Sequence, residues 1–90
     1  MLIRASDARI KTKNNAIYRI FIDRISDHIE MGIRLGRYDI NVSSRILGED
    51  DSLIKVPYEV MKLALEELEK LGYKARITND KELLEIHWED

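Results

Sequence analysis

The segment 56–88 constrains the fold of this chain most strongly, because the spacing of its apolar residues changes at Gly72. Pro57 suits the first turn of a helix, where a backbone N–H is not needed. The apolar residues that follow are three and four positions apart, which is typical of an amphipathic helix. They are Val60, Met61, Ala64, Leu65, Leu68 and Leu71. Gly72 suits the left-handed residue that ends many helices, and Tyr73 follows as its apolar contact.

After Gly72 apolar and polar residues alternate, which predicts β-strands. Two such runs, 73–78 and 84–88, flank the polar residues 79–82, so we expect a hairpin with 79–82 as its loop. The register that follows pairs Ile77 with Leu84, Ala75 with Ile86, Tyr73 with Trp88, Arg76 with Glu85 and Lys74 with His87. The hairpin should therefore have one apolar face, on which Trp88 is mostly buried, and one charged face.

Length and composition exclude several classes of protein. Ninety residues make one small domain, 1–90, with a modest core. There is no cysteine, so neither disulfides nor thiolate metal ligands are available. No apolar stretch approaches the roughly 18 residues of a membrane span, and the N-terminus lacks the apolar core of a signal peptide. We expect a soluble, cytoplasmic protein with no membrane partner.

The first part of the chain predicts a long helix, from Ser6 or Asp7 to about Leu35, with Gly36 as its stop. Residues 11–15 favour a helix only weakly, so the alternatives to a continuous helix are a break at these residues or a start after them. Its apolar residues cover an arc of about 160° on a helical wheel, whereas one packed face needs about 100°. They are Ile17, Tyr18, Phe21, Ile22, Ile25, Ile29 and Ile33. The helix thus carries more apolar surface than its own sheet can cover.

Between the two helices the sequence predicts one strand, at 38–43, where apolar residues alternate with polar ones. Residues 44–55 show no clear pattern, and so long a connection is either mobile or functional. The order αβαββ predicts an α+β fold, a three-stranded mixed sheet with both helices packed on one face. The last strand should lie in the centre of the sheet; the alternative places the first two strands side by side.

No arrangement of residues in the sequence favours catalysis or a cofactor. His28 and His87 are the two histidines, and no further ligands converge on either by spacing to hold zinc. The acidic run 49–51 lacks the alternating ligands and central glycine of a calcium loop. No histidine stands at a motif spacing to activate a serine, and the glycines form no phosphate-binding pattern. We expect no enzyme activity and no catalytic, metal-binding or cofactor-binding residues.

The excess apolar surface predicts self-association through the first helix, most simply as a two-fold dimer. A continuous helix over 6–35 would be about 45 Å long and would overhang a domain whose expected radius of gyration is about 12 Å. The residues expected at this contact are Tyr18, Ile22, Ile25, His28, Ile29 and Ile33. The connection 44–55 and the polar face of the sheet are the other candidate surfaces for a protein partner.

Positive charge is concentrated near the N-terminus, which makes nucleic acid or a nucleotide the alternative partner. Residues 1–24 carry six Lys and Arg against two acidic residues, whereas 25–90 carry nine against fifteen. The candidate contacts are Arg9, Lys11, Lys13, Arg19 and Arg24. No helix-turn-helix, zinc-finger or RNP aromatic pattern accompanies them, so binding to protein is the first expectation.

In the C-terminal half, a helix that ends in Leu71, Gly72, Tyr73 and Lys74 precedes a short hairpin that ends near Ile86 and Trp88. With these residues, segment 56–90 resembles the end of small uncharacterised accessory proteins encoded by phages and prophages of Gram-positive bacteria. The resemblance brings no catalytic residues. It implies a non-catalytic protein-binding role in the bacterial host cytoplasm, as an inhibitor of a host factor or an anti-defence factor.

Overall fold

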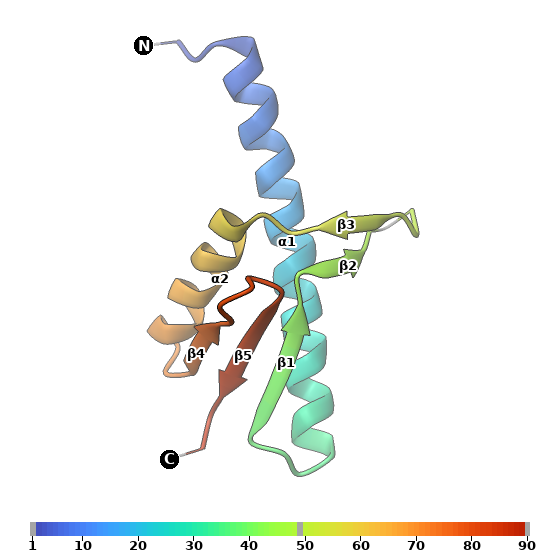
Figure 1. Cartoon of the computed structure of the whole chain (residues 1–90), viewed down its shortest axis with the longest axis vertical. Helices are drawn as coiled ribbons and strands as arrows, with labels where there is room; N and C mark the ends of the chain where they lie inside the picture. Colours follow the sequence, from blue (N-terminus) through green and yellow to red (C-terminus); the bar gives the residue numbers. More distant parts are fainter. Residues whose placement is uncertain (1, 49, 90) are drawn as a thin grey trace.

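The structure, a computed structural model, describes residues 2–48 and 50–89, with the side chain of residue 10 left out. The elements, in chain order, are α1 (Ala5–Arg34), β1 (Asp39–Ser43), β2 (Arg45–Leu47), β3 (Leu53–Lys55), α2 (Tyr58–Lys70), β4 (Lys74–Ile77) and β5 (Leu83–His87). One sheet has the order β1-β5-β4, and β2 pairs with β3. Both helices lie behind the three-stranded sheet in Figure 1. The predicted α+β fold, the long first helix and the central last strand are confirmed.

The predicted hairpin register is confirmed: Ala75 pairs with Ile86, Arg76 with Glu85 and Ile77 with Leu84. The prediction of a mixed sheet is wrong, because β5 runs antiparallel to both of its neighbours. The outer strands β1 and β4 run in the same direction, but β5 separates them, so no parallel pair forms.

The core lies between this sheet and the two helices. Its fully buried members come from every layer, and the largest are Phe21, Met61, Leu84, Ile86, Val42, Val56 and Val60. Trp88 is mostly buried, as the sequence predicted, and it keeps some exposed surface because it lies past the last paired residue of β5 at one end of the core. On the opposite face of the sheet the guanidinium of Arg76 pairs with the carboxylate of Glu85 at 2.6 Å, which confirms the charged face.

Helix α1 is continuous through residues 11–15, where no glycine or proline interrupts it. It ends where the sequence predicted, because Gly36 has φ of 72° and Arg37 N–H donates to the carbonyl of Gly32 at 2.8 Å. The long axis of the molecule measures 47 Å and the radius of gyration is 14.3 Å, against about 12 Å for a compact domain of this length. The predicted overhang is confirmed.

The overhanging part of α1, residues 5–16, is called the arm. In Figure 1 it rises beyond every other element of the chain. All of its described side chains are exposed except that of Asn14, which is half-buried. The arm therefore contributes almost nothing to the core.

Helix α2 ends through the same motif as α1. Gly72 has φ of 97°, and Tyr73 N–H donates to the carbonyl of Leu68 at 3.0 Å. Pro57 is the residue that precedes the first helical residue, one position earlier than the sequence predicted. Its missing N–H is equally harmless there.

The connection 44–55 is not patternless, as the sequence analysis expected, but contains the β2–β3 hairpin. Each strand has only three residues, too few to show a period, and their pairing depends on tertiary contacts. Ile46 faces the core and is buried, whereas Leu47 and Leu53 are exposed. The carboxylate of Glu82 ties this hairpin to the β4–β5 loop through Lys55 at 3.2 Å and Arg45 at 3.7 Å.

Candidate functional site

Two adjoining hollows lie between the C-terminal half of α1 and the end of α2, with volumes of about 190 and 240 Å³. Both are lined by Ile29, Leu71 and Tyr73, so they form one depression, called here the α1/α2 groove. Ile33 and Trp88 close one end, and Ile22, Ser26, Glu30 and Glu67 line the other. The groove is apolar in its centre and acidic at its rim.

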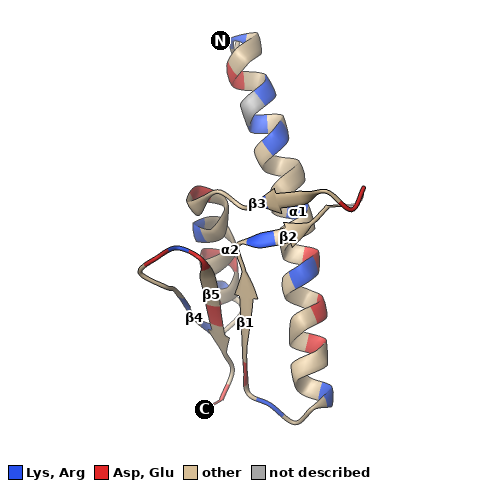
Figure 2. Cartoon of the chain, turned by 45° about the vertical axis from the view of Figure 1, so that its right-hand side comes forward, with Lys and Arg blue, Asp and Glu red and all other residues tan. Residues whose placement is uncertain are grey.

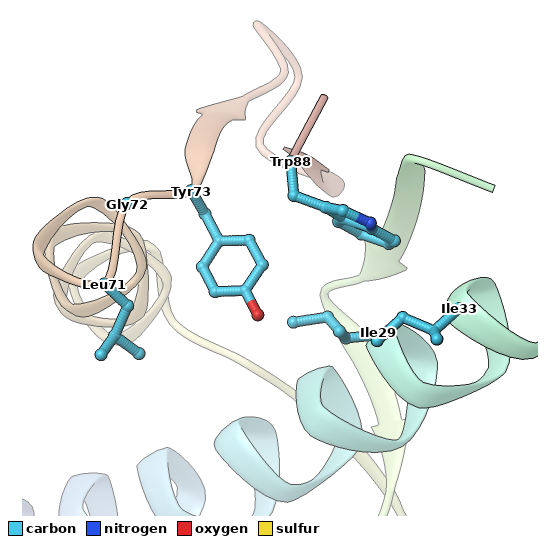
Figure 3. A pocket seen from close by; sticks show the side chains of 6 residues that line it. All are labelled: Ile29, Ile33, Leu71, Gly72, Tyr73 and Trp88. Carbon is cyan, nitrogen blue, oxygen red and sulfur yellow. The ribbon is translucent and has the colours of Figure 1, made fainter. Parts of the chain in front are cut away.

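Two glycines shape this groove. Gly72 adopts the left-handed conformation that turns the chain out of α2 and brings Tyr73 between the helices; Figure 3 shows the ring of Tyr73 pointing toward α1, with Trp88 beside it. Gly32 is buried on α1, where an added Cβ would lie 2.9 Å from Ile40 Cγ2 and 3.0 Å from Trp88 Cη2. The indole can therefore approach the helix only because residue 32 lacks a side chain.

The two sides of the groove expose large aliphatic side chains. Ile33 on α1 is 60% exposed and Leu71 at the end of α2 is 68% exposed. Between them Ile22, Ile29 and Tyr73 are half-buried. Such a surface offers an apolar side chain or helix a place to pack.

The six residues predicted for a contact between two copies of the chain do not all lie on one surface in the structure. Ile25 is only 2% exposed and belongs to the core, so it contributes to the floor of the groove but offers little surface to a second copy. Helix α1 packs against the sheet and α2 at once, and these two contacts cover more of its apolar arc than one packed face would. Ile22, Ile29 and Ile33 do line the groove. His28 lines a different hollow, beside Met31 and Ile40.

Tyr18 is half-buried and precedes Ile22, a residue of the groove, by about one turn of α1. Burial, and then the negative charge of Glu67, raise the pKa of its phenol. The ring is therefore neutral at physiological pH.

The C-terminal half of the chain also contributes Leu71, Tyr73 and Trp88 to this surface, which was not predicted from the sequence. Leu71 was assigned to the buried stripe of α2, but it is the residue that ends the helix and its side chain is exposed. Tyr73 was expected to contact the end of the second helix and to pair with Trp88 on the sheet, and neither residue was predicted to line a groove beside the first helix. A signal was present in the Leu71-Gly72-Tyr73 sequence, because a left-handed glycine redirects the chain and so exposes the residue before it.

The five basic candidates for nucleic-acid contact also divide into two groups. Arg9, Lys11, Lys13 and Arg19 are exposed along α1, and Figure 2 shows basic residues in blue along the upper part of this helix. Arg24 is half-buried; it donates to the carbonyl of Leu47 at 3.0 Å and lies 4.0 Å from Asp27. Arg24 therefore holds the β2–β3 hairpin against α1, which sets it apart from the four exposed basic residues.

Among the described residues, no group of three or more His, Asp or Glu side chains is arranged to hold a metal ion. Of the acidic run 49–51, Glu49 lies outside the residues that the structure describes. Asp50 accepts hydrogen bonds from the hydroxyl and the N–H of Ser52, and these bonds lower the pKa of Asp50. Asp50 thus stabilises the turn between β2 and β3 through its hydrogen bonds with Ser52.

Comparisons with known protein families, curated proteins and solved structures found no match. Within residues 2–48 and 50–89, no helix is long and apolar enough to cross a membrane. The function is therefore inferred from two surfaces, the α1/α2 groove and the arm.

Proposed function

We propose that this chain is a non-catalytic protein-binding protein that acts as a homodimer, joined through α1 and the α1/α2 groove. The observation that supports this most directly is the pair Ile33 and Leu71, which are 60% and 68% exposed over half-buried Ile29 and Tyr73. Contiguous apolar surface of this kind marks interaction sites. A two-fold contact covers the same patch on both copies at once, and two-fold closure is the commonest solution for homo-oligomers.

The geometry of the groove suits a helix as its occupant. The groove is bounded by two helices, and a third helix can lie along it at the usual interaxial distance of about 8–10 Å. The α1 helix of a second copy fits this role, because its Ile33 projects from the same surface that it would cover.

Sedimentation equilibrium over about 1–100 µM tests the contact, since the monomer has a mass of 10.6 kDa. The wild type should show twice this mass. The double variant Ile33→Ser, Leu71→Ser removes two exposed aliphatic side chains per copy, each worth about 1.5–3 kcal/mol when fully buried. We expect its dissociation constant to rise at least about a hundredfold, in keeping with that loss.

The matched control is the double variant Met31→Ser, Leu63→Ser, because these side chains are 61% and 55% exposed but do not line the groove. It should retain the dimer. A wild type that is monomeric at 100 µM, or equal dissociation of both double variants, contradicts the proposal.

We further propose that the dimer acts on a protein of a bacterial host, in its cytoplasm, as an inhibitor or anti-defence factor. The resemblance of segment 56–90 to phage accessory proteins supports this role. Expressed in bacteria that carry a phage-defence system, the wild type should restore plaques to a sensitive phage, and Ile33→Ser, Leu71→Ser should not. Unchanged plaque counts across a panel of defence systems would contradict the anti-defence role.

A further inference from the structure

Packing against the domain does not explain the composition of the arm. Its described side chains are exposed around the whole circumference, apart from half-buried Asn14, and it extends past every other element in Figure 1. A helix of this length is marginal by itself in water, so an arm without a partner gains little from its own contacts. Its side chains are free to reach another molecule.

Charge is strongly divided between the N-terminal end of the chain, which is the arm with residues 2–4 before it, and the rest of the molecule. Residues 2–16 carry four basic residues, Arg4, Arg9, Lys11 and Lys13, against Asp7. Residues 17–90 carry eleven basic against sixteen acidic residues. In the described part of the chain, no ion pair involves the four basic residues of this end. The arm is therefore a positive projection on an acidic body, which fits a polyanion as its partner.

The basic side chains of the arm stand on two opposite sides of the helix. At about 100° per residue, Lys11 lies on one side and Arg9 with Lys13 on the other. Between these two sides runs a stripe at positions four, three and four apart, formed by Ala8, Thr12, Asn15 and Arg19. This stripe points away from the buried residues Ile17 and Phe21, by about 180° on the same wheel. It is exposed at all four positions.

We propose that the arm binds in the major groove of duplex DNA, with Lys11 on one side and Arg9 and Lys13 on the other against the phosphates, and the outward stripe at the base edges. An α-helix is about 10–12 Å across, and the major groove of B-DNA is about 12 Å wide. Basic residues on both sides of a helix can reach both strands. The major groove of A-form RNA is too narrow for this docking.

The residues of the outward stripe match the chemistry of base edges. An arginine can donate two hydrogen bonds to guanine, an asparagine amide can pair with adenine, and the methyl groups of alanine and threonine can contact the methyl of thymine. Arg19, Asn15, Thr12 and Ala8 supply one of each kind. Small side chains near the end of the arm also let the helix approach the floor of the groove closely.

The same outward side of α1 becomes acidic below the stripe, with Asp23, Asp27 and Glu30 exposed. Carboxylates repel the phosphate backbone, so the contact must end near Arg19. Only the arm and the next turn of α1, as far as Arg19, then enter the DNA, which agrees with the projection of the arm from the domain (Figure 1). This placement uses different residues from the α1/α2 groove and does not depend on the dimer.

Fluorescence anisotropy with a labelled 24-base-pair duplex pool of random sequence tests the proposal at about 50 and 200 mM salt. With about four phosphate contacts, from Lys11, Arg9 and Lys13 together with the exposed Arg4 just before α1, the slope of log K against log[salt] is about −3.6, so affinity should fall about a hundredfold between the two conditions. The variant Arg4→Gln, Arg9→Gln, Lys11→Gln, Lys13→Gln should bind at least thirtyfold more weakly at 50 mM. Glutamine keeps the helix propensity, and circular dichroism should confirm an unchanged helix content.

The matched control removes the same charge from the body: Arg34→Gln, Lys62→Gln, Lys70→Gln, Lys74→Gln, all at exposed positions. It should bind within threefold of the wild type. Bound protein should also protect guanine N7, an acceptor in the major groove, from methylation by dimethyl sulfate. The proposal is overturned by no binding at 50 mM salt, by equal losses in both quadruple variants, by unprotected N7, or by equal affinity for double-stranded RNA of the same length.

Discussion

The rings of Tyr73 and Trp88 meet edge to face, with centroids 6.1 Å apart and planes inclined at 84°. Tyr73 directly precedes β4 and Trp88 directly follows β5, so the pair continues the strand register by one step beyond the hydrogen-bonded ladder. The backbone N–H of Trp88 donates a hydrogen bond to the carbonyl of Tyr38 at 3.0 Å. The pair closes the end of the core that opens into the α1/α2 groove.

Replacing this indole should cost less than the loss of a fully buried tryptophan. Removal of a buried Trp costs about 3–5 kcal/mol, and Trp88 is mostly but not fully buried, so we expect Trp88→Ala to lower the free energy of unfolding by about 2–3 kcal/mol. Urea denaturation measures it. Tyr38→Ala, at an exposed aromatic, should cost less than about 1 kcal/mol. An emission maximum typical of a water-exposed indole in the folded wild type would refute the placement of Trp88.

Gly32→Ala should destabilise the protein although alanine is the better helix former. Alanine gains about 1 kcal/mol in a helix interior, but its Cβ would meet Ile40 Cγ2 at 2.9 Å and Trp88 Cη2 at 3.0 Å. Overpacking typically costs about 1–3 kcal/mol, so we expect a net loss of up to about 2 kcal/mol. In the Trp88→Ala background Gly32→Ala should lower the free energy of unfolding by less, because the indole that the added Cβ would meet is absent. Ser26→Ala, exposed on the same helix, should be neutral or stabilising, and a Gly32→Ala protein more stable than the wild type would contradict the close packing.

Acid should weaken the β4–β5 turn through Asp80. Hydrogen bonds from the Thr78 hydroxyl and then from Glu82 N–H lower the pKa of Asp80 below 3.8. Because the folded pKa lies below the unfolded one, the ionised carboxylate stabilises the fold above pH 3.8, and this contribution is lost as the pH falls through the folded pKa. An NMR titration of the Asp80 carboxyl carbon should give a midpoint under 3.8. Thr78→Val should move the midpoint upward and Thr78→Ser should not; a wild-type midpoint at 3.8 or above would disprove the bond.

Among the strand pairs that the structure describes, the β2–β3 hairpin should be the first to lose its hydrogen bonds in local unfolding. It has three paired residues per strand and is held to the rest by Arg24 on the Leu47 carbonyl and by Glu82 on Lys55 and Arg45. We expect its amides to exchange with solvent at least about tenfold faster than those of β5. Glu82→Gln should accelerate exchange in the hairpin a few-fold, in line with the small worth of exposed ion pairs, and leave β5 unchanged. Equal protection of both would contradict this order.

Much of the fold was predictable because its signals are local. Gly36 and Gly72 end the two helices through their own backbone conformation, and the alternation around residues 79–82 fixes the β4–β5 register within one hairpin. The candidate site was less predictable. The sequence identified Ile22, Ile29 and Ile33 on α1, but the groove also needs Leu71, Tyr73 and Trp88, which only the packing of α2 and the hairpin brings to them.

The sequence by itself determined where the helices end, how β4 pairs with β5 and that the first helix outgrows its domain, since periodicity, glycine conformation and helix rise depend on neighbouring residues in the chain. Tertiary structure decided which apolar residues stay exposed. Ile25 and Ile33 have the same chemistry and lie on one helix, yet they are 2% and 60% exposed, because burial depends on which elements pack over each position. The same dependence forms the β2–β3 hairpin from strands too short to be recognised, and it leaves the arm without any covering element.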